Sequence, residues 1–373
     1  MKGFQRCTRC VMDNTSDTTI TFNSSGHCNY CSEALSQLGK VYFPNEEGEK
    51  RLHILIARLK KENKEKQYDC IMGISGGLDS SYLAYLGAVK WGLRILGVHV
   101  DDGYDTEISK NNIQNLCRAA KIKLVTINPD AKQFNELTRA YILAGVPNLA
   151  APQDNVLFAC VYKFAKEQGI RTFLSGGNFA LECILQRGNT HDAYDVQNIK
   201  DINQQFGREK INKLQLISNL QRDVDAYLLG IETPRPLNYI DYNRKHALKE
   251  LNEFCGFEYY GSKHLENTLT KFIQVYWFYH KFNVDKRKSH LSSMIVSNQM
   301  SRDRALEILE EPLYDENQMQ KDIDFILNRV NISRKEFEHL MKLPPRQHTD
   351  YKTSLYAEAR KKIRRVAKII LRK

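Results

Sequence analysis

Four of the nine cysteines lie in two C-x-x-C pairs near the amino terminus and could together bind a metal ion. The pairs are Cys7 with Cys10 and Cys28 with Cys31. Two tight turns with this spacing supply four thiolates in the tetrahedral arrangement that zinc requires. The alternatives are disulfides, which a reducing cytosol disfavours, and a redox dithiol, which needs only one pair. Four cysteines fill all four coordination positions of zinc and leave none for water or substrate. We therefore expect the zinc to be structural.

A glycine-rich loop between a short apolar run and a helical pattern could bind phosphate. Residues 75–81 read Ser-Gly-Gly-Leu-Asp-Ser-Ser and follow the apolar residues 70–74. Glycines let a phosphate approach the main chain, and the N–H groups that begin a helix point at it. Ser75 and Ser80 add hydroxyl donors, and Asp79 can hold Mg²⁺. The loop has no Gly-Lys-Ser/Thr ending and is therefore not a Walker A loop; a plain turn is the alternative.

The elements that would position this loop predict an α/β fold with a doubly wound parallel sheet. β-rich runs at 93–100, 122–127 and 171–175 follow the loop and alternate with helical patterns. Ligands of such sheets bind beyond the carboxyl ends of the strands, so the turns 101–104 and 176–178 should meet the loop. The predicted ATP contacts are Ser75, Gly76, Gly77, Asp79, Ser80, His99, Gly176 and Asn178. His99 lies inside a predicted strand, and a histidine in such a position more often packs against its neighbours than acts in catalysis.

Helical patterns dominate the carboxy-terminal third. Phe272, Val275, Tyr276 and Tyr279 follow one helical face, which predicts a core stripe covering the nucleotide cleft rather than a base-stacking surface. Ser301 and Ser333 are predicted helix N-caps. The predicted organisation is a zinc ribbon at 1–45, a nucleotide domain at 46–200, a mostly helical substrate or partner region at 201–345, and a basic helix or tail at 346–373.

The phosphate loop resembles the PP-loop of the ATP pyrophosphatases, also called the adenine nucleotide alpha hydrolase-like fold. Over nearly the whole chain, the sequence is similar to the N-acetyl sugar amidotransferases of bacterial surface-polysaccharide (lipopolysaccharide O-antigen type) biosynthesis. The segments that carry this resemblance are the two C-x-x-C pairs, Ile74–Ser81, Asp102–Tyr104 with Glu107, Ala144–Pro147, Pro152–Asp154, Ser175–Asn178 with Glu182, Asp241–Asn243, Gly261–Glu266 and Asp285–Ser293.

The resemblance implies an enzyme that uses ATP, Mg²⁺ and structural Zn²⁺. It would adenylate the N-acetyl oxygen of a nucleotide-linked sugar, such as a diacetamido uronic acid, and replace that oxygen with ammonia to give an acetamidino group. The candidate catalytic residues are Asp79, Asp154, Glu182 and Lys263, and the candidate substrate contacts are His264, Lys286 and Arg287. For the charged candidates outside the loop, the alternative is a solvated side chain without a ligand.

The ammonia is expected to come from another protein. The chain begins Met1-Lys2-Gly3, without the amino-terminal cysteine nucleophile of one glutaminase class. The other class needs a domain of its own, and the whole length of the chain is already assigned to other elements. The resemblance implies a separate glutaminase, often with a second subunit like the histidine-pathway cyclase.

Two other functions are compatible with parts of the sequence. Zinc-ribbon PP-loop enzymes that thiolate tRNA resemble this chain, but they usually carry a C-x-x-C pair before the fourth strand. The matching segment here is Cys160-Val161-Tyr162-Lys163, which lacks the second cysteine. An inert nucleotide-binding scaffold is the other alternative, although the loop retains Asp79 and its serines.

The net charge of +11 is concentrated near the carboxy terminus. Residues 359–373 hold eight Lys or Arg and no Asp or Glu, and removing these eight from the 55 basic residues leaves 47 against 44 acidic ones. This distribution argues against a broad nucleic-acid surface. Ile363, Val366, Ala367 and Ile370 share one helical face, so the segment could lie on an anionic membrane; a helix packed on the body or a frayed tail is the alternative.

The composition predicts a folded cytoplasmic protein. The chain is 42% hydrophobic and 27% charged, which lacks the signature of disorder. No apolar run approaches the roughly 18 to 20 residues of a membrane span, and the first residues lack the apolar core of a signal peptide. We expect a cytoplasmic location, with residues 359–373 as a possible peripheral contact at the inner membrane.

Overall fold

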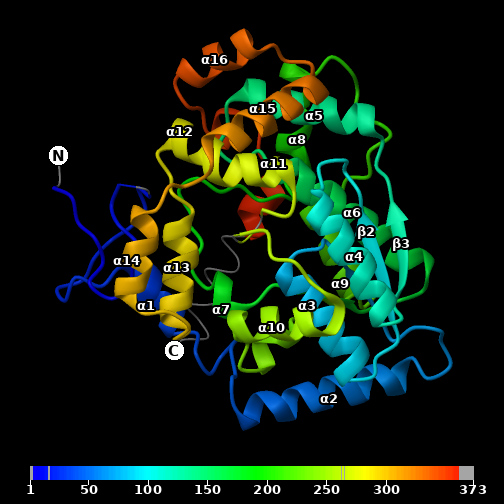
Figure 1. Ribbon diagram of the computed structural model, residues 1–373. Coiled ribbons are helices and arrows are strands. Elements are labelled where there is room, and N and C mark those ends of the chain that lie inside the picture. Colours follow the sequence, from blue (N-terminus) through cyan, green and yellow to red (C-terminus); the bar gives the residue numbers. More distant parts are fainter. Residues whose placement is uncertain (1–2, 16, 262, 264, 361–373) are drawn as a thin grey trace.

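The computed structural model describes residues 3–15, 17–261, 263 and 265–360. Helices surround a small parallel sheet, and the amino-terminal segment packs at one side (Figure 1). The predicted class, an α/β fold with a parallel sheet and a helical carboxy-terminal region, is confirmed.

The sheet has four parallel strands in the order β3-β2-β1-β4. The chain places β2 and β3 on one side of β1 and β4 on the other side. The strand order therefore reverses between β1 and β4, and ligands of doubly wound sheets bind at such a point. All four predicted strands form, each slightly shorter than its predicted run. They are β1 (Cys70–Gly73), β2 (Ile95–Val100), β3 (Lys123–Ile127) and β4 (Phe173–Leu174).

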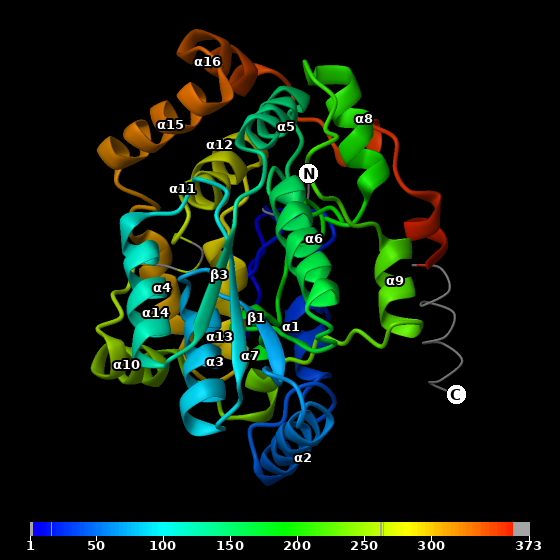
Figure 2. The same cartoon turned by 90° about the vertical axis from the view of Figure 1, so that its right-hand side faces the viewer.

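Both faces of the sheet are covered by helices (Figure 2). Side chains alternate across a strand, so Cys70 and Met72 pack with one set of helices and Ile71 with the other. The first face meets α2 (Glu46–Glu62), α3 (Leu78–Tyr85), α4 (Glu107–Ala119) and α10 (Arg244–Cys255), with a π-helical turn at Leu86–Lys90. The second face meets α6 (Ala151–Glu167).

A second core joins helices that are far apart in the sequence. Helices α5 and α8 pack with the carboxy-terminal helices, so the hydrophobic packing crosses the expected boundary at residue 200. The members are α5 (Ala131–Ala144), α8 (Val196–Phe206), α11 (Thr268–Lys271), α12 (Phe278–Phe282), α15 (Glu316–Val330) and α16 (Arg334–Lys342). Ser333 is the N-cap of α16, as predicted, and accepts the Glu336 N–H at 3.2 Å.

A π-helical segment, Phe272–Trp277, lies between α11 and α12. Phe272 and Val275 are buried as predicted, but Tyr279 is 43% exposed. The prediction was wrong at Tyr279 because a π-helical turn holds more residues than an α-helical one and rotates the following side chains away from the face.

The amino-terminal segment and its helix α1 (Asn29–Leu35) pack against α13 (Arg287–Val296) and α14 (Arg302–Glu310). The Val11 N–H donates to Ser292 Oγ at 3.2 Å, and Lys288 Nζ pairs with the buried carboxylate of Asp13 at 2.6 Å. Ser301 caps α14 as predicted.

The remaining described elements connect these layers. Residues 348–360 return to α8 and α9. Of the basic segment predicted at 359–373, residues 361–373 lie outside the described residues. Among the residues that the structure describes, no helix is long and apolar enough to cross a membrane. The connecting elements are α7 (Phe179–Glu182), α9 (Asn219–Tyr227) and the 3-10 turns Pro236–Tyr239 and His348–Asp350.

Candidate active site

A cavity of about 580 Å³ lies at the carboxyl ends of the strands. The phosphate loop, the turns after β2 and β4, and residues of α13 and α14 line it. The predicted meeting of the loop with both turns is therefore confirmed. Asp102 in the turn after β2 accepts from Gln153 at 2.6 Å and from Asn267 at 3.1 Å, which joins this turn to α6 and to the residue before α11.

The loop end of the cavity has the hydroxyls and close backbone approach expected of a phosphate site. Ser75 Oγ and Ser80 Oγ are 3.1 Å apart, and Ser75 Oγ accepts the Gly77 N–H at 3.3 Å. Gly76 has φ +76°, and a Cβ there would lie 2.5 Å from a main-chain oxygen of α4. A Cβ on Gly176 would lie only 3.0 Å from the Ser80 nitrogen. Gly76 thus allows the loop to pack against α4, and Gly176 allows the turn after β4 to approach the start of α3.

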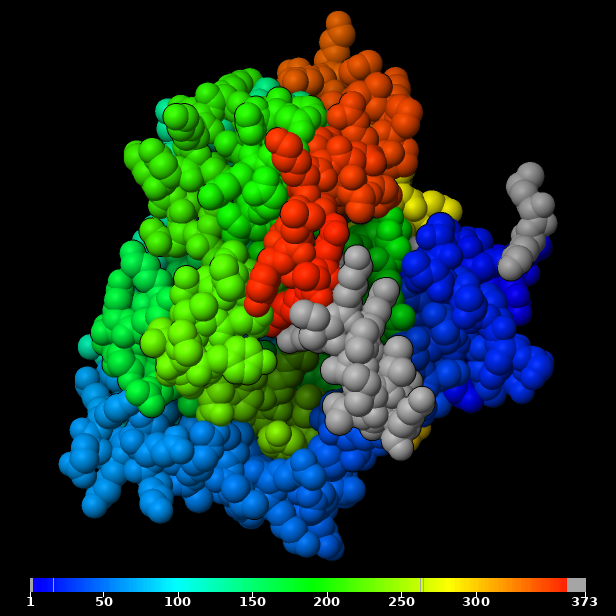
Figure 3. Space-filling view, turned by 180° about the vertical axis from the view of Figure 1, so that it is seen from behind, coloured from blue at the N-terminus to red at the C-terminus, as the bar shows by residue number. Residues whose placement is uncertain are grey.

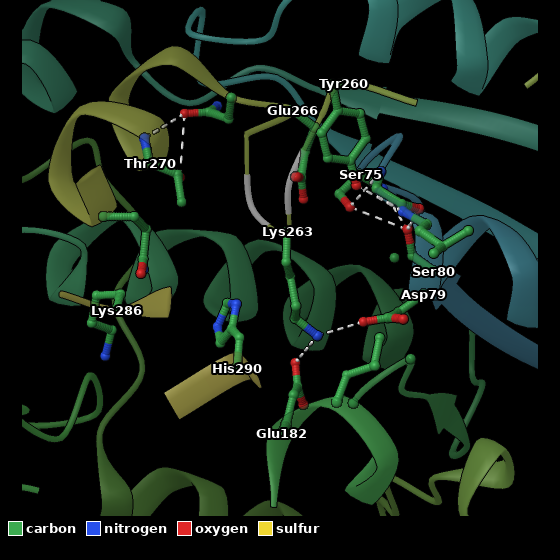
Figure 4. Close-up of a pocket in the computed structure, with 18 of the residues that line it drawn as sticks. Ser75, Asp79, Ser80, Glu182, Tyr260, Lys263, Glu266, Thr270, Lys286 and His290 are labelled. Carbon is green, nitrogen blue, oxygen red and sulfur yellow. Dashed lines mark hydrogen bonds and ion pairs between the residues drawn. The ribbon is translucent and has the colours of Figure 1, made fainter. Parts of the chain in front are cut away.

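An ion cluster stands at the centre of the cavity (Figure 4). Lys263 Nζ lies 2.6 Å from Asp79 Oδ2 and 2.8 Å from Glu182 Oε1, and the Tyr242 hydroxyl donates to Asp79 Oδ1 at 2.5 Å. Burial opposes the charge of Lys263, but the two carboxylates raise its pKa above the usual range. Three of the four predicted catalytic residues are therefore in direct contact, and Lys263 is held as a cation.

Glu266 adds a third carboxyl group beside the loop. A Cβ on Gly77 would lie 2.6 Å from Glu266 Oε1, and Glu266 Oε2 has no hydrogen-bond partner among the described residues. Burial raises the pKa of Glu266 to about 7. Carboxylate oxygens are the ligands that Mg²⁺ prefers, so Asp79, in the first turn of α3 beside the phosphate loop, is a suitable ligand for this ion.

Asp154, the fourth predicted catalytic residue, projects into the cavity from the first turn of α6. The cavity leaves its carboxylate accessible, while the surrounding protein raises its pKa to about 7. A carboxyl group with this pKa can either accept or release a proton near neutral pH.

Residues of α13 form the opposite end of the cavity. Lys286 lines this end and lies 5.0 Å from the Phe278 ring centroid, and no carboxylate in the described part of the chain pairs with it. Burial lowers the pKa of Lys286 to about 8. His290 lies one turn further along α13 and also lines the cavity (Figure 4).

Arg287 borders the cavity, but its guanidinium is already engaged. It pairs with Asp285 at 2.8 Å and donates to the carbonyl oxygens of Ile308 and Glu311. Its side chain therefore joins the start of α13 to the end of α14. His264, the third predicted substrate contact, lies outside the described residues.

Three predicted ATP contacts have structural partners of their own. Asn178 is buried, and its side chain caps α7 by accepting the Leu181 N–H. Neither Asn178 nor Gly76 lines the cavity. His99 lines the cavity, with Nδ1 2.9 Å from the Ile74 carbonyl oxygen and Nε2 3.0 Å from Asp105. Burial opposes protonation, but the Asp105 carboxylate raises the pKa of His99. These contacts fit the packed role that a strand histidine usually has.

Sequence reasoning did not select two polar residues that line the cavity, Tyr260 and Glu266, or Tyr242, which contacts Asp79. Tyr242, Tyr260 and Glu266 were part of, or adjacent to, the segments that carry the family resemblance, which is the signal that could have found them. Tyr260 accepts the Leu78 N–H at the start of α3, at 2.9 Å, and so lies directly at the loop.

The four amino-terminal cysteines are brought together and buried. Cys7 and Cys31 have sulfur atoms 3.7 Å apart, Cys10 and Cys28 3.6 Å apart, and all four lie within 4.8 Å of one another. Zinc bound to four thiolates at about 2.3 Å requires sulfurs about 3.8 Å apart, so the arrangement fits zinc. The Cys28 N–H donates to Cys7 Sγ at 3.2 Å, an interaction that stabilises a thiolate ligand.

Comparison with known proteins links the carboxy-terminal region to polysaccharide synthesis. Residues 266–364 match the family described as LPS biosynthesis protein WbpG-like, C-terminal domain. An uncharacterized protein of Methanocaldococcus jannaschii, MJ1599, is 32% identical over 126 residues, which cover 34% of this chain and 43% of that protein. The match thus spans less than half the length of this relative.

Solved structures similar to this chain include two synthetases of pyridine nucleotides. The NMN synthetase from Francisella tularensis gives a TM-score of 0.33 at 14% identity, and the NH3-dependent NAD synthetase from Campylobacter jejuni gives 0.29 at 13%. Each alignment covers 80% of this chain and 98% of the other. TM-scores of this size mark a distant likeness.

Proposed function

We propose that this chain is an ATP-dependent amidotransferase that converts the N-acetyl group of a nucleotide-linked sugar into an acetamidino group. The observation that carries the proposal is one cavity with a phosphate loop at one end, the Lys263 ion cluster at its centre and, at the other end, Lys286, which has no carboxylate partner among the described residues. The match of residues 266–364 to a lipopolysaccharide-biosynthesis domain supports a sugar as the acceptor.

The chemistry proceeds in two balanced steps. The acetamido oxygen attacks the α-phosphorus of ATP, the bond to the β-phosphate breaks, and pyrophosphate leaves. Ammonia then adds to the carbon of the resulting O-adenylyl imidate, and AMP departs with the former amide oxygen. Adenylation is needed because an amide oxygen is a very poor leaving group, whereas AMP is a good one.

The residues of the loop end suit the first step. The loop hydroxyls and the N–H groups at the start of α3 would bind the β- and γ-phosphates, and Lys263 would offset the charge that develops on pyrophosphate. Asp79 would hold Mg²⁺, which supplies charge neutralisation on phosphate oxygens when it is bound. Without ATP, Lys263 neutralises the carboxylates of Asp79 and Glu182.

Residues further from the loop suit the acceptor and the second step. Lys286 would pair with an acidic group of the sugar nucleotide, because a half-buried cation without a carboxylate partner in the described part of the chain is stabilised by an anionic ligand. Asp154, with a pKa of about 7, would take the proton that the incoming ammonia must lose. His290 would contact the acceptor between these two positions.

Product analysis tests this function. The chain is incubated with ATP, Mg²⁺, ammonium and a nucleotide-linked diacetamido uronic acid, and AMP, pyrophosphate and the sugar are quantified. We expect AMP, pyrophosphate and acetamidino sugar in equal amounts. Formation of ADP, or AMP release that does not depend on the sugar, would contradict the proposal.

The thiolation alternative predicts a reactive cysteine in the same domain. Cys160 is buried among apolar side chains of α6, and burial raises its pKa to about 11, so it is a thiol at neutral pH. We therefore expect no sulfur transfer when tRNA and a sulfur donor replace the sugar and ammonium.

We also propose that ammonia comes from a separate glutaminase, with a cyclase-like subunit to deliver it. Glutamine without these partners should give no product, whereas ammonium should. Turnover of the purified chain on glutamine alone would contradict the partner requirement and leave the proposed reaction intact.

A further inference from the structure

A histidine and two aspartates meet where β2 ends, and their metal-binding atoms lie close together. His99 is the second-last residue of β2, and Asp101 and Asp105 lie in the turn that follows. The ligand atoms of these three residues all lie within 4.8 Å of one another. His99 and Asp105 also line the cavity. Imidazole nitrogens and carboxylate oxygens are common ligands of divalent transition metals.

The backbone holds the His99 ring with one nitrogen next to Asp105. Nδ1 lies 2.9 Å from the Ile74 carbonyl oxygen, and a carbonyl oxygen can only accept, so Nδ1 carries a hydrogen. In the neutral ring, Nε2 then has a free lone pair, and this atom lies 3.0 Å from Asp105 Oδ2. A histidine that binds a metal usually has this form, with one ring nitrogen donating to a carbonyl or carboxylate and the other free to ligate.

The Asp105 carboxylate is buried but only partly satisfied. Its side chain is 7% exposed, and Oδ1 accepts from Asn267 at 3.2 Å. Oδ2 has no hydrogen-bond partner among the described residues, so its 3.0 Å contact with His99 lacks the geometry of a hydrogen bond. Adjacent ligands of an octahedral ion, each about 2.1 Å from it, lie about 3.0 Å apart. The contact therefore fits two ligands of one ion.

The turn after β2 also holds more negative charge than its described neighbours balance. Asp102 is a third carboxylate of this turn, and its two oxygens accept from Gln153 and Asn267. In the described part of the chain, no Lys or Arg forms an ion pair with any of the three aspartates, and a protonated His99 would offset only one of them. Buried carboxylates are normally paired with a cation or coordinate a metal. A divalent cation would supply the missing charge.

We propose that His99, Asp101 and Asp105 bind a divalent transition-metal ion at the edge of the cavity. A nitrogen ligand with two carboxylates suits such an ion better than Mg²⁺, which prefers oxygen ligands alone. Three protein ligands leave coordination positions open, and these positions can take water or an anionic ligand that enters the cavity. The site is distinct from Asp79, which belongs to the first turn of α3.

Manganese binding by the full chain without nucleotide tests the site. Mn²⁺ is detected by electron paramagnetic resonance, and its preference for oxygen and nitrogen ligands keeps it from competing for the four cysteines. We expect one bound Mn²⁺ per chain, with a nitrogen signal from a coordinated imidazole in pulsed spectra. Asp105→Asn keeps the size of the side chain and should weaken binding at least about 100-fold. His99→Asn can still donate to the Ile74 carbonyl oxygen and should remove the nitrogen signal as well.

Glu107→Gln is the matched control. It removes a carboxylate two residues from Asp105, but the Glu107 side chain is 83% exposed and pairs with Lys110. Its Mn²⁺ affinity should equal that of the unchanged chain, and circular dichroism checks that every variant is folded.

Two results would overturn the proposal. One is the absence of Mn²⁺ binding by the unchanged chain, which would leave His99 and Asp105 as an ion pair only. The other is binding whose affinity and nitrogen signal persist in both Asp105→Asn and His99→Asn, which would place the metal at other residues, such as Asp79.

Discussion

The two ends of the cavity are built in different ways. The loop end comes from residues that are close in sequence, 73–80, and from two turns that the parallel sheet brings to the same edge. The α13 end depends on contacts between segments almost 300 residues apart, such as Arg302 Nη2 with the Cys7 carbonyl oxygen at 3.1 Å. The loop end is thus a local sequence motif that the sheet positions. The α13 end is instead formed by the packing of distant segments, which include the amino-terminal segment that holds the four cysteines.

This difference suggests that the two ends of the cavity have separate roles, one in binding ATP and the other in binding the acceptor. The loop end has main-chain N–H groups and hydroxyls, which the proposed binding and cleavage of ATP would need. The α13 end holds Lys286 and His290 in positions set by the packing of α13 on the ribbon and α14. Variants at the two ends should therefore affect ATP and the acceptor separately, and the central lysine should affect both.

Lys263→Met is expected to have the largest effect. The change removes the cation that faces Asp79 and Glu182 and that would offset charge on the leaving pyrophosphate. Loss of one such group should lower the rate of pyrophosphate release by about 10³-fold, measured at saturating ATP and acceptor. Lys271→Met is the matched control, because Lys271 pairs with Asp322 at 2.6 Å and does not line the cavity. An equal loss in both variants would show that the effect is structural.

Lys286→Met should act on the acceptor alone. A hydrogen bond to a charged group contributes about 1.5–3 kcal/mol, so KM for an acidic sugar nucleotide should rise about 30-fold, while KM for ATP is unchanged. The pKa of Lys286 is lowered to about 8, so the cation is present below this pH and is lost as the pH rises through it. Acceptor KM should therefore rise between pH 7 and 9 in the unchanged chain and stay flat in the variant. A rise of similar size in both would assign the pH effect to another group.

Gly176→Ala should act on ATP alone. The added Cβ would lie 3.0 Å from the Ser80 nitrogen and 3.1 Å from the Asp79 carbonyl carbon, and these main-chain atoms cannot move aside as a flexible side chain could. Overpacking of this kind costs about 1–3 kcal/mol. We expect the loop to move away to relieve it, which weakens its phosphate contacts by a similar amount and raises KM for ATP about tenfold. Gly169→Ala, at a glycine with open space around it, controls for the change in residue type but carries backbone strain at φ +63°. A larger effect of Gly169→Ala on KM for ATP would contradict this explanation.

The same contrast explains what could be predicted from the sequence. The four cysteines and the loop were found because each site is encoded by spacing within a short segment, and the strands were found from their apolar runs. The contact of Tyr242 with Asp79 and the position of Glu266 beside Gly77 depend on tertiary packing across more than 150 residues, which spacing does not report. Arg287 was predicted to bind substrate because its charge is visible in the sequence, but its partners in α14 are not.

Lys288→Met tests whether the ribbon positions the α13 end, and we expect its effect to be the smallest. Lys288 pairs at 2.6 Å with Asp13, whose carboxylate is fully buried beside the cysteine cluster. Burial raises the pKa of Asp13, but the hydrogen bond and charge of Lys288 and the bonds from Thr15 outweigh it and lower the pKa. This stabilisation is present above the pKa of an unfolded aspartate and is lost as the pH falls through the lowered value.

Removing the lysine leaves that carboxylate without its main cation, so the free energy of unfolding should fall by about 3 kcal/mol or more at neutral pH. If the ribbon holds α13 in place, KM for the acceptor should also rise about threefold, with KM for ATP unchanged, because a small shift of α13 moves Lys286 and leaves the sheet where it is. Lys249→Met, which removes an exposed pair with Glu253 on α10, is the control and should change neither quantity. A loss of stability without any change in acceptor KM would separate the ribbon from the site and restrict its role to folding.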